Sequence, residues 1–145
     1  MKKILFFILC VAAFAASCSK DISSNELFLK EFVAQNELTK TFLSGTVVKW
    51  RTTDSIGVFS AAGAPAKFTV KTLENEGASA TFTGTVADAD TYYAVYPYSA
   101  VSSLSSTGKI LSSIPVVQSF TTSSFSDGAN LAIAKTTNNT LAFKN

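Results

Sequence analysis

Segments in which apolar and polar side chains alternate every second residue recur along the chain from Leu27 onward. The clearest is 78–86, where small or apolar residues alternate with serine and threonine. Segment 67–71 has the same pattern, with Phe68 and Val70 on one side and lysine and threonine on the other. Because successive side chains of a β-strand point to opposite faces of a sheet, both segments are predicted to be strands with one buried face.

Further strands are predicted where β-branched and aromatic residues lie between turn signals. Segment 91–96 is almost continuously apolar or aromatic, which is typical of a strand buried on both faces. Residues 99–107 are rich in serine, and a surface loop is predicted there. Segment 27–34 is ambiguous between a strand and one helical turn. The other predicted strands are 37–43, 46–51, 55–60, 109–114, 116–120, 131–135 and 140–144.

Turn signals join several of these short strands. A Ser-Gly break between 37–43 and 46–51 indicates one hairpin, and the Asn-Asn pair after 131–135 indicates another with 140–144. No long amphipathic helix interrupts the series. The chain is therefore predicted to be all-β, a sandwich or barrel in one domain of ordinary size.

The first residues have the layout of a secretory signal. Two lysines precede an apolar run over 4–14, and small residues lead to Ser17 and Cys18. The run is shorter than the ~20 residues that a membrane-spanning helix requires. Residues 1–17 are therefore predicted to be a signal peptide that is cleaved between Ser17 and Cys18.

Cys18 has two interpretations, and both remain open. The small residues before it resemble the lipobox of bacterial lipoproteins, which implies a covalent lipid on Cys18 and a membrane anchor. The other interpretation is an ordinary signal peptide with a cysteine near its end. Residues 18–26 are predicted to be the lipidated cysteine and a flexible polar tether. The sequence Ser19-Lys20-Asp21 is either a solvated linker or a surface-export signal of Bacteroidetes lipoproteins, which it resembles.

Composition argues against several classes of function. The chain has 12 basic and 10 acidic side chains, and the two lysines of the predicted signal account for the excess, so no basic stripe for nucleic acid is expected. Histidine, the commonest general base and metal ligand, does not occur. Cys10 lies in the predicted signal and Cys18 at its end, so no disulfide is expected in the mature domain.

The remaining chemistry-bearing residues do not form a known catalytic or metal motif. The serines lack a Gly-x-Ser-x-Gly elbow, and Asp88 and Asp90 lack the glycine and glutamate of a calcium loop. The protein is therefore predicted not to be an enzyme, to have no catalytic residues, and to hold no metal and no cofactor besides the lipid on Cys18.

A series of short segments resembles the N-terminal half of the fimbrillin-like lipoproteins of Bacteroidetes. Their order and spacing match over about residues 37–145. The segments are Thr39-Lys40-Thr41, Val48-Lys49-Trp50 with Asp54, Ile56, Val58 and Phe59, Ala80-x-Phe82, Tyr93-Ala94-Val95-Tyr96-Pro97-Tyr98-Ser99, Ile114-Pro115-x-x-Gln118 and Leu141-x-Phe143.

This resemblance implies a transthyretin-like, Greek-key, antiparallel β-sandwich over 27–145, equivalent to the family's N-terminal domain. Because the family's second domain has no counterpart and 140–144 is a predicted strand at the end of the chain, a truncated domain is predicted. It would lack a final strand or the second domain and expose an edge or groove. The resemblance also implies an exported protein that is lipid-anchored in the outer membrane, at the cell surface and in a pilus. Its partners would be other fimbrial subunits, joined by donor-strand pairing.

The matched residues have predicted structural roles. Asp54 is predicted to cap a turn by bonding backbone N–H groups. Tyr96 and Pro97 lie among further tyrosines, which could form a carbohydrate platform but are favoured to pack at a strand corner. The residues predicted to fill the core are Trp50, Ile56, Val58 and Phe59.

Ser55 is a candidate modification site. Asp54-Ser55-Ile56 resembles the O-glycosylation sequon of these bacteria, which implies a glycan on Ser55. The competing explanation is that the three residues belong to the core motif. The two explanations are compatible if the side chain of Ile56 points inward and that of Ser55 points outward.

The predicted function is that of a lipid-anchored, cell-surface structural subunit of fimbrial or adhesin type. It would be non-catalytic and would assemble when an exposed edge accepts a partner strand. The alternative is a surface lipoprotein that binds a glycan or peptide, including one from a host, in the loops 97–107 or 121–130.

Overall fold

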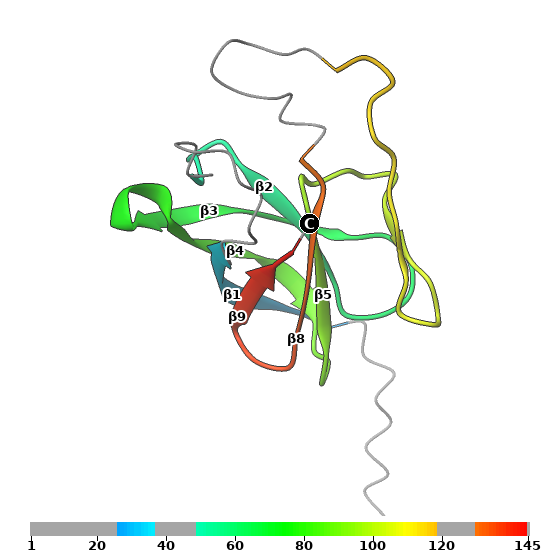
Figure 1. The fold of residues 1–145 in the computed structure, drawn as a ribbon. Coiled ribbons are helices and arrows are strands. Elements are labelled where there is room, and N and C mark those ends of the chain that lie inside the picture. Colours follow the sequence, from blue (N-terminus) through cyan, green and yellow to red (C-terminus); the bar gives the residue numbers. More distant parts are fainter. Residues whose placement is uncertain (1–25, 37–48, 119–129, 145) are drawn as a thin grey trace, which may run out of the picture.

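The computed structural model describes residues 26–36, 49–118 and 130–144 (Figure 1). The predicted signal peptide, nearly all of the tether and most of the predicted hairpin of 37–43 and 46–51 lie outside these residues. The described elements are β1 (Leu27–Asn36), β2 (Ser55–Phe59), β3 (Ala66–Glu74), the short 3-10 helix η1 (Asn75–Gly77), β4 (Ser79–Ala87), β5 (Tyr92–Tyr96), β6 (Ser103–Leu104), β7 (Ile110–Leu111), β8 (Ala132–Thr136) and β9 (Thr140–Phe143).

Seven of these strands form one curled sheet in the order β8-β5-β2-β3-β4-β1-β9, and β6 and β7 form a separate small sheet. Neighbouring strands are antiparallel except for β1 and β9, which run parallel. The large sheet nearly closes into a barrel, because Ile133 in β8 and Lys144 after β9 exchange two backbone hydrogen bonds of 2.9 Å. The predicted all-β, sandwich-like fold is confirmed, and the parallel pair is the exception to its antiparallel character.

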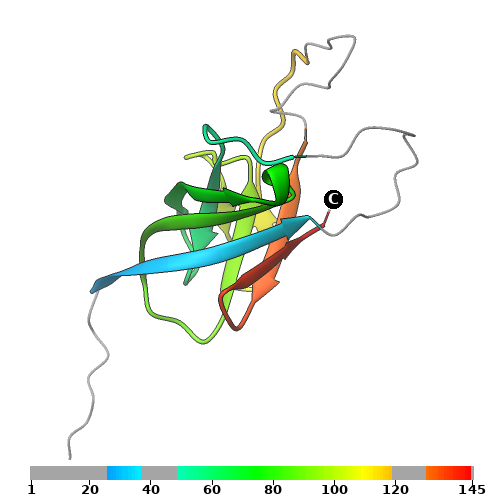
Figure 2. The ribbon, with the colours of Figure 1, turned by 90° about the vertical axis from the view of Figure 1, so that its left-hand side faces the viewer.

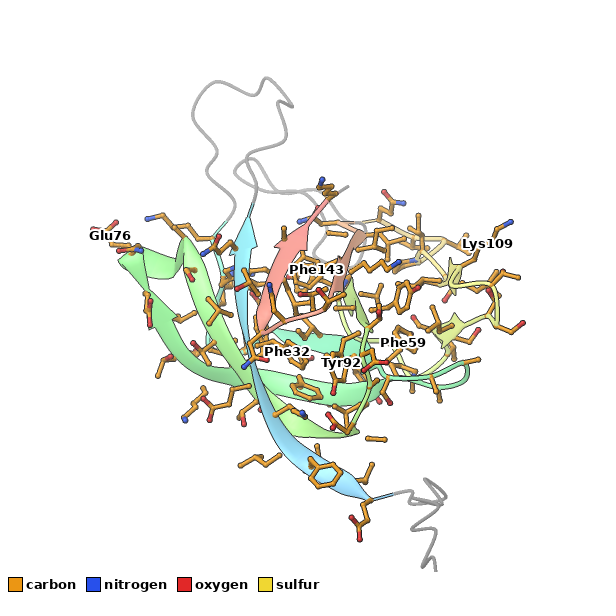
Figure 3. All side chains as sticks on the ribbon, turned by 90° about the horizontal axis from the view of Figure 1, so that it is seen from below. Phe32, Phe59, Glu76, Tyr92, Lys109 and Phe143 are labelled. Carbon is orange, nitrogen blue, oxygen red and sulfur yellow. The ribbon has the colours of Figure 1, made fainter. Side chains whose placement is uncertain are left out.

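The main core lies inside the curled sheet and is rich in aromatic rings. Phe32 packs against Phe68 and Tyr92, with ring centroids 5.7 and 5.1 Å apart. Figure 3 shows Phe32 and Tyr92 close together in the interior. The alternation predicted for 67–71 and 78–86 is confirmed, because apolar residues of β3 and β4 enter this core while the residues between them are exposed in β3 and mostly half-buried in β4.

Glycine allows two close approaches in this core. A Cβ at Gly84 would lie 2.7 Å from the ring of Phe68, so glycine lets that ring lie against β4. Gly77 has a φ of +89°, and its carbonyl accepts a 2.7 Å hydrogen bond from the backbone N–H of Trp50. A side chain at either position would push an aromatic residue away from its present place.

Strand β5 is buried on both faces, as predicted. Ala94 packs into the main core, whereas Val95 packs on the other side against Phe59 and Leu104. The small β6–β7 sheet therefore covers the outer face of β5 with a second, smaller core. This explains why 91–96 is apolar without alternation.

Three predictions about the segments after β5 are wrong. Residues 99–107 are not only a surface loop, because β6 lies within them and Leu104 and Ser102 are buried. The predicted strand 109–114 is reduced to β7, and residues 112–118 form no strand, so none begins at 116 as predicted. A bridge between Gly63 and Leu104 holds β6 against the loop after β2, which no local sequence pattern indicates.

The last two strands also differ from the predicted hairpin. β8 and β9 follow each other around a tight turn, but in the described backbone they are hydrogen-bonded to each other only at Ile133 and Lys144. β8 pairs instead with β5, and β9 with β1. Pairing with β1 lets Leu141 and Phe143 enter the main core, and this burial favours the parallel arrangement.

Candidate functional site

Strand β1 has two neighbours along one part of its length and one neighbour along the rest. It pairs with β4 from Leu27 to Gln35, but β9 joins its other edge only from Val33 to Asn36. No other described strand pairs with that edge before Val33. Figure 2 shows the first part of β1 projecting away from β9. We call residues 27–31 the open half of β1.

The backbone direction of β1 shows which groups face the unpaired edge. The N–H of Val33 donates a 2.8 Å hydrogen bond to the carbonyl of Asn139, so Val33 faces the β9 side. Since backbone groups of alternate strand residues point the same way, Leu27, Leu29 and Glu31 present their N–H and C=O groups on this side too. Among the described residues, the donors and acceptors on this edge of the open half have no partner strand, and their spacing matches that of another strand.

The side chains of the open half are unusually apolar for a free edge. Leu27, Phe28 and Leu29 are 65%, 44% and 71% exposed. A long apolar edge strand is normally shielded, because it pairs readily with other chains. The open half thus combines free backbone groups with an apolar surface on both faces of the strand.

The two charged residues of the open half are held by ion pairs. Lys30 Nζ donates to Asp88 Oδ1 at 2.7 Å, and the carboxylate also accepts a 3.0 Å hydrogen bond from Tyr92 Oη. On the opposite face of β1, Lys71 pairs with Glu31. The hydrogen bond from Lys30 lowers the pKa of Asp88, and the same contact raises the pKa of Lys30.

These contacts tie the open half to neighbouring elements of the same chain. The pair between Lys30 and Asp88 ties β1 to the connection after β4, and the pair between Glu31 and Lys71 ties it to β3. Tyr92 Oη also accepts a hydrogen bond from the N–H of Ala89, which fixes that connection. Because both charges are already paired, they oppose an apolar partner less than free charges would.

The predicted core residues lie apart from this edge. Trp50, Ile56 and Val58 are buried in the main core, and Phe59 is buried in the smaller one. Trp50 meets Phe82, Tyr96 and Phe143 at ring distances of 5.1 to 5.6 Å. Its indole Nε1 is buried and has no hydrogen-bond partner among the described residues.

Asp54 caps a turn. Its Oδ2 accepts a 2.8 Å hydrogen bond from the N–H of Arg51, and its Oδ1 accepts one of 3.3 Å from Tyr96 Oη. Tyr96 is half-buried, and a cis peptide bond joins it to Pro97. At this corner the Tyr96 ring packs edge-on against Trp50.

One predicted modification site lies within the described residues and the other lies outside them. Ser55 is half-buried at the start of β2, and its carbonyl accepts a hydrogen bond from the N–H of Tyr98. The glycan on Ser55 stays a prediction. Ser17 and Cys18, where cleavage and lipid attachment are predicted, lie outside the described residues.

The open half is the feature that the sequence interpretation missed. Segment 27–34 was ambiguous because Leu27, Phe28 and Leu29 are consecutive apolar residues and show no alternation. A strand with one solvent-exposed face does not need an apolar residue at every position. This run, placed directly after a polar stretch, is the signal that could have indicated an apolar edge.

A second surface feature lies at the turn between β8 and β9. It is a shallow depression of about 430 Å³ lined by Lys135, Thr136, Thr137, Asn138 and Thr140. Asn138 Oδ1 already accepts hydrogen bonds from Thr136 Oγ1 and the N–H of Thr140. The amide oxygen at its centre is therefore used by the turn itself.

The described part of the chain has neither a metal-ligand cluster nor a spanning helix. No three His, Cys, Asp or Glu side chains come together there in a group that could hold a metal ion. No helix among these residues has the length and apolarity to cross a bilayer.

Comparison with known proteins identifies no family for this chain. No protein-family model matches the chain, and neither the curated proteins nor the solved structures give a significant match. The chemistry of its own surface, above all the open half of β1, is therefore the basis for a functional proposal.

Proposed function

We propose that this protein is a lipid-anchored, cell-surface structural subunit of fimbrial or adhesin type, which assembles by strand pairing and does not catalyse a reaction. The observation that carries this proposal is the open half of β1. Within the described sheet it has an unpaired backbone edge, with three exposed apolar side chains and two charged side chains that both form ion pairs.

In the proposed mechanism a partner strand adds to the edge of β1. Its backbone bonds to the N–H and C=O groups of Leu27, Leu29 and Glu31, and its alternate side chains cover the apolar surface of the open half. β9 occupies the same edge from Val33 onward, so the added strand ends where β9 begins. The site therefore accepts a strand segment of about five residues.

The proposed lipid would hold this edge near a membrane. Cys18 is the proposed attachment point, and a tether over residues 19–26 reaches at most roughly 30 Å when fully extended. β1 is the first described element after that tether. Localisation in the outer membrane, at the cell surface, would place the open half where neighbouring exported subunits can reach it.

The strand-pairing proposal is tested by removing one edge donor. The Leu29→Pro variant loses an N–H that faces the open edge, while the ladder with β4 keeps its hydrogen bonds. The control Leu29→Ala keeps the N–H and shortens the side chain. A labelled peptide of alternating valine and threonine should bind the full chain, and Leu29→Pro should weaken this binding by about tenfold, more than the control does.

Circular dichroism of each variant checks that the sheet is intact. Equal peptide binding by wild type and Leu29→Pro, with folding preserved, would contradict the proposal. The lipid anchor has its own test, because a palmitate analogue fed to expressing cells should label the protein through Cys18. Label retained by Cys18→Ala would refute the anchor.

The alternative proposal is a binding module for a glycan or peptide. It is favoured by the polar depression at the β8–β9 turn, which the exposed Thr137 and Thr140 line with hydroxyl groups that suit a sugar. Selective retention on a glycan array, abolished by Thr137→Ala and unaffected by Leu29→Pro, would favour this alternative over strand assembly.

A further inference from the structure

The surface after β7 carries a second group of exposed apolar side chains. Ile114 and Val117 are 50% and 80% exposed, and Val116 is fully exposed. Residues 112–118 belong to no strand, and the stretch 110–118 has no charged residue. Exposed β-branched side chains in an unpaired backbone are the usual composition of a strand that pairs with another chain.

The base of this segment is fixed to the molecule. Ser112 Oγ lies 2.8 Å from Oγ of the buried Ser102, which is within hydrogen-bond distance. Residues 113–118 continue from that point without a described strand partner. The segment is therefore attached at one end while its apolar side chains face solvent.

The exposed segment and the open half of β1 are far apart on the same molecule. In Figures 1 and 2 the gold segment lies at the top of the molecule, whereas the start of β1 lies well below it and, in Figure 2, at the far left. A contact between them must therefore join two copies. Such a head-to-tail contact leaves a free edge and a free segment at the two ends, so it extends into a chain of subunits.

We propose that residues 113–118 of one copy add as a strand to the open half of β1 in a second copy. This inference rests on the proposed function and supplies its partner. The segment is uncharged and its length is sufficient for the five residues of the open half. Its apolar side chains match the exposed leucines of the acceptor.

Proline in the segment is compatible with this pairing. When Ile114, Val116 and Gln118 turn their backbone groups toward the acceptor, Pro115 faces away, and its missing N–H removes no hydrogen bond between the copies. Ile114 and Val116 then share one face of the added strand, and Pro115 and Val117 share the other. Pro115 thus decides which alternate residues of the segment turn their backbone groups toward the acceptor.

The test measures the association of the full chain in detergent by light scattering over a range of concentrations. The wild type should form chains that grow with concentration, and a peptide of residues 112–118 should bind to it and shorten them. Leu29→Lys and Val116→Glu should each abolish association. An equimolar mixture of these two variants should form mixed pairs, because the Leu29→Lys copy keeps an intact segment 113–118 and the Val116→Glu copy keeps an intact open half.

The possible outcomes separate this inference from the function on which it rests. If the valine–threonine peptide binds at Leu29 while the 112–118 peptide does not and the wild type stays monomeric, the second-copy partner is wrong and strand pairing stands. If neither peptide binds to the folded protein, both proposals fall. Thr107→Glu, a matched change on an exposed loop outside both surfaces, should associate like the wild type.

Discussion

The two halves of β1 belong to one continuous strand, yet they have opposite surroundings. From Val33 onward β9 lies along the second edge of β1, and Phe32 and Ala34 in this part of the strand are completely buried. The open half has the same ladder with β4 but no second neighbour in the described sheet, and its first residues are exposed. The difference shows that a strand's role is set by its second neighbour as much as by its own residues.

The boundary between the halves is set by the turn before β9. Asn138 accepts hydrogen bonds through its side chain from Thr136 and from the N–H of Thr140, so the turn is held tightly. Thr140 is consequently the first residue of β9, and it lies opposite Val33. The length of the open half follows from this local geometry at the far end of the chain.

The largest contrast is expected between Phe32→Ala and Leu29→Ala. Phe32 packs against Phe68 and Tyr92 inside the barrel, so its truncation should lower the free energy of unfolding by about 3–5 kcal/mol. Leu29 is mostly exposed, and its truncation should cost less than about 1 kcal/mol. Urea denaturation measures the free energy of unfolding of each variant. Similar decreases in the two variants would contradict the division of β1 into two halves.

The next effect concerns the strand to which the open half is bonded. Gly84 pairs with Lys30, and a Cβ there would lie 2.7 Å from the ring of Phe68, so Gly84→Ala should destabilise the protein by about 1–3 kcal/mol. Thr85→Ala, on the exposed side of the same strand, should have little effect on the melting temperature. A stable Gly84→Ala variant would mean that the Phe68 ring can move away from β4.

A smaller effect is expected at the turn that sets the boundary. Asn138→Ala removes the acceptor for Thr136 and Thr140, which should lower stability by about 1 kcal/mol and loosen the start of β9. Asn139→Ala is the matched control, because Asn139 contributes its backbone carbonyl to Val33. Amide exchange of Val33 should accelerate in Asn138→Ala and not in Asn139→Ala. Unchanged exchange of Val33 in Asn138→Ala would show that the turn does not set the boundary between the two halves of β1.

The smallest effect is expected for Asp88→Asn, which weakens the ion pair with Lys30 in the open half. Global stability should change little, because the pair is exposed to solvent. Amide exchange in 27–31 should accelerate, while exchange in 33–36 should not. Uniform acceleration along β1 would show that the ion pair does not act on the open half specifically.

The pH dependence of this contact follows from the lowered pKa of Asp88. A carboxylate whose pKa is lower in the folded state stabilises the fold above its ordinary value of 3.8, and this contribution is lost as the pH falls through the folded pKa. The open half should therefore lose exchange protection below about pH 3.8 in the wild type. Asp88→Asn should lack this transition.

Much of the fold was predictable because burial on one face leaves a local pattern. β3 and β4 alternate, β5 is apolar throughout, and the structure places all three as the patterns predict. The small β6–β7 sheet was not predictable in the same way. β6 and β7 have two residues each, and their burial depends on a contact with Gly63 far back in the sequence.

The sequence by itself determined the all-β class and part of the main core, because period-two alternation and aromatic side chains act locally on each strand. Only the tertiary structure decided which strand edges are paired. Alternation tells which face of a strand such as β3 or β4 is buried, but it says nothing about whether another strand lies beside an edge. Near-closure of the sheet placed β9 in parallel beside the last part of β1 and left 27–31 with an unpaired edge.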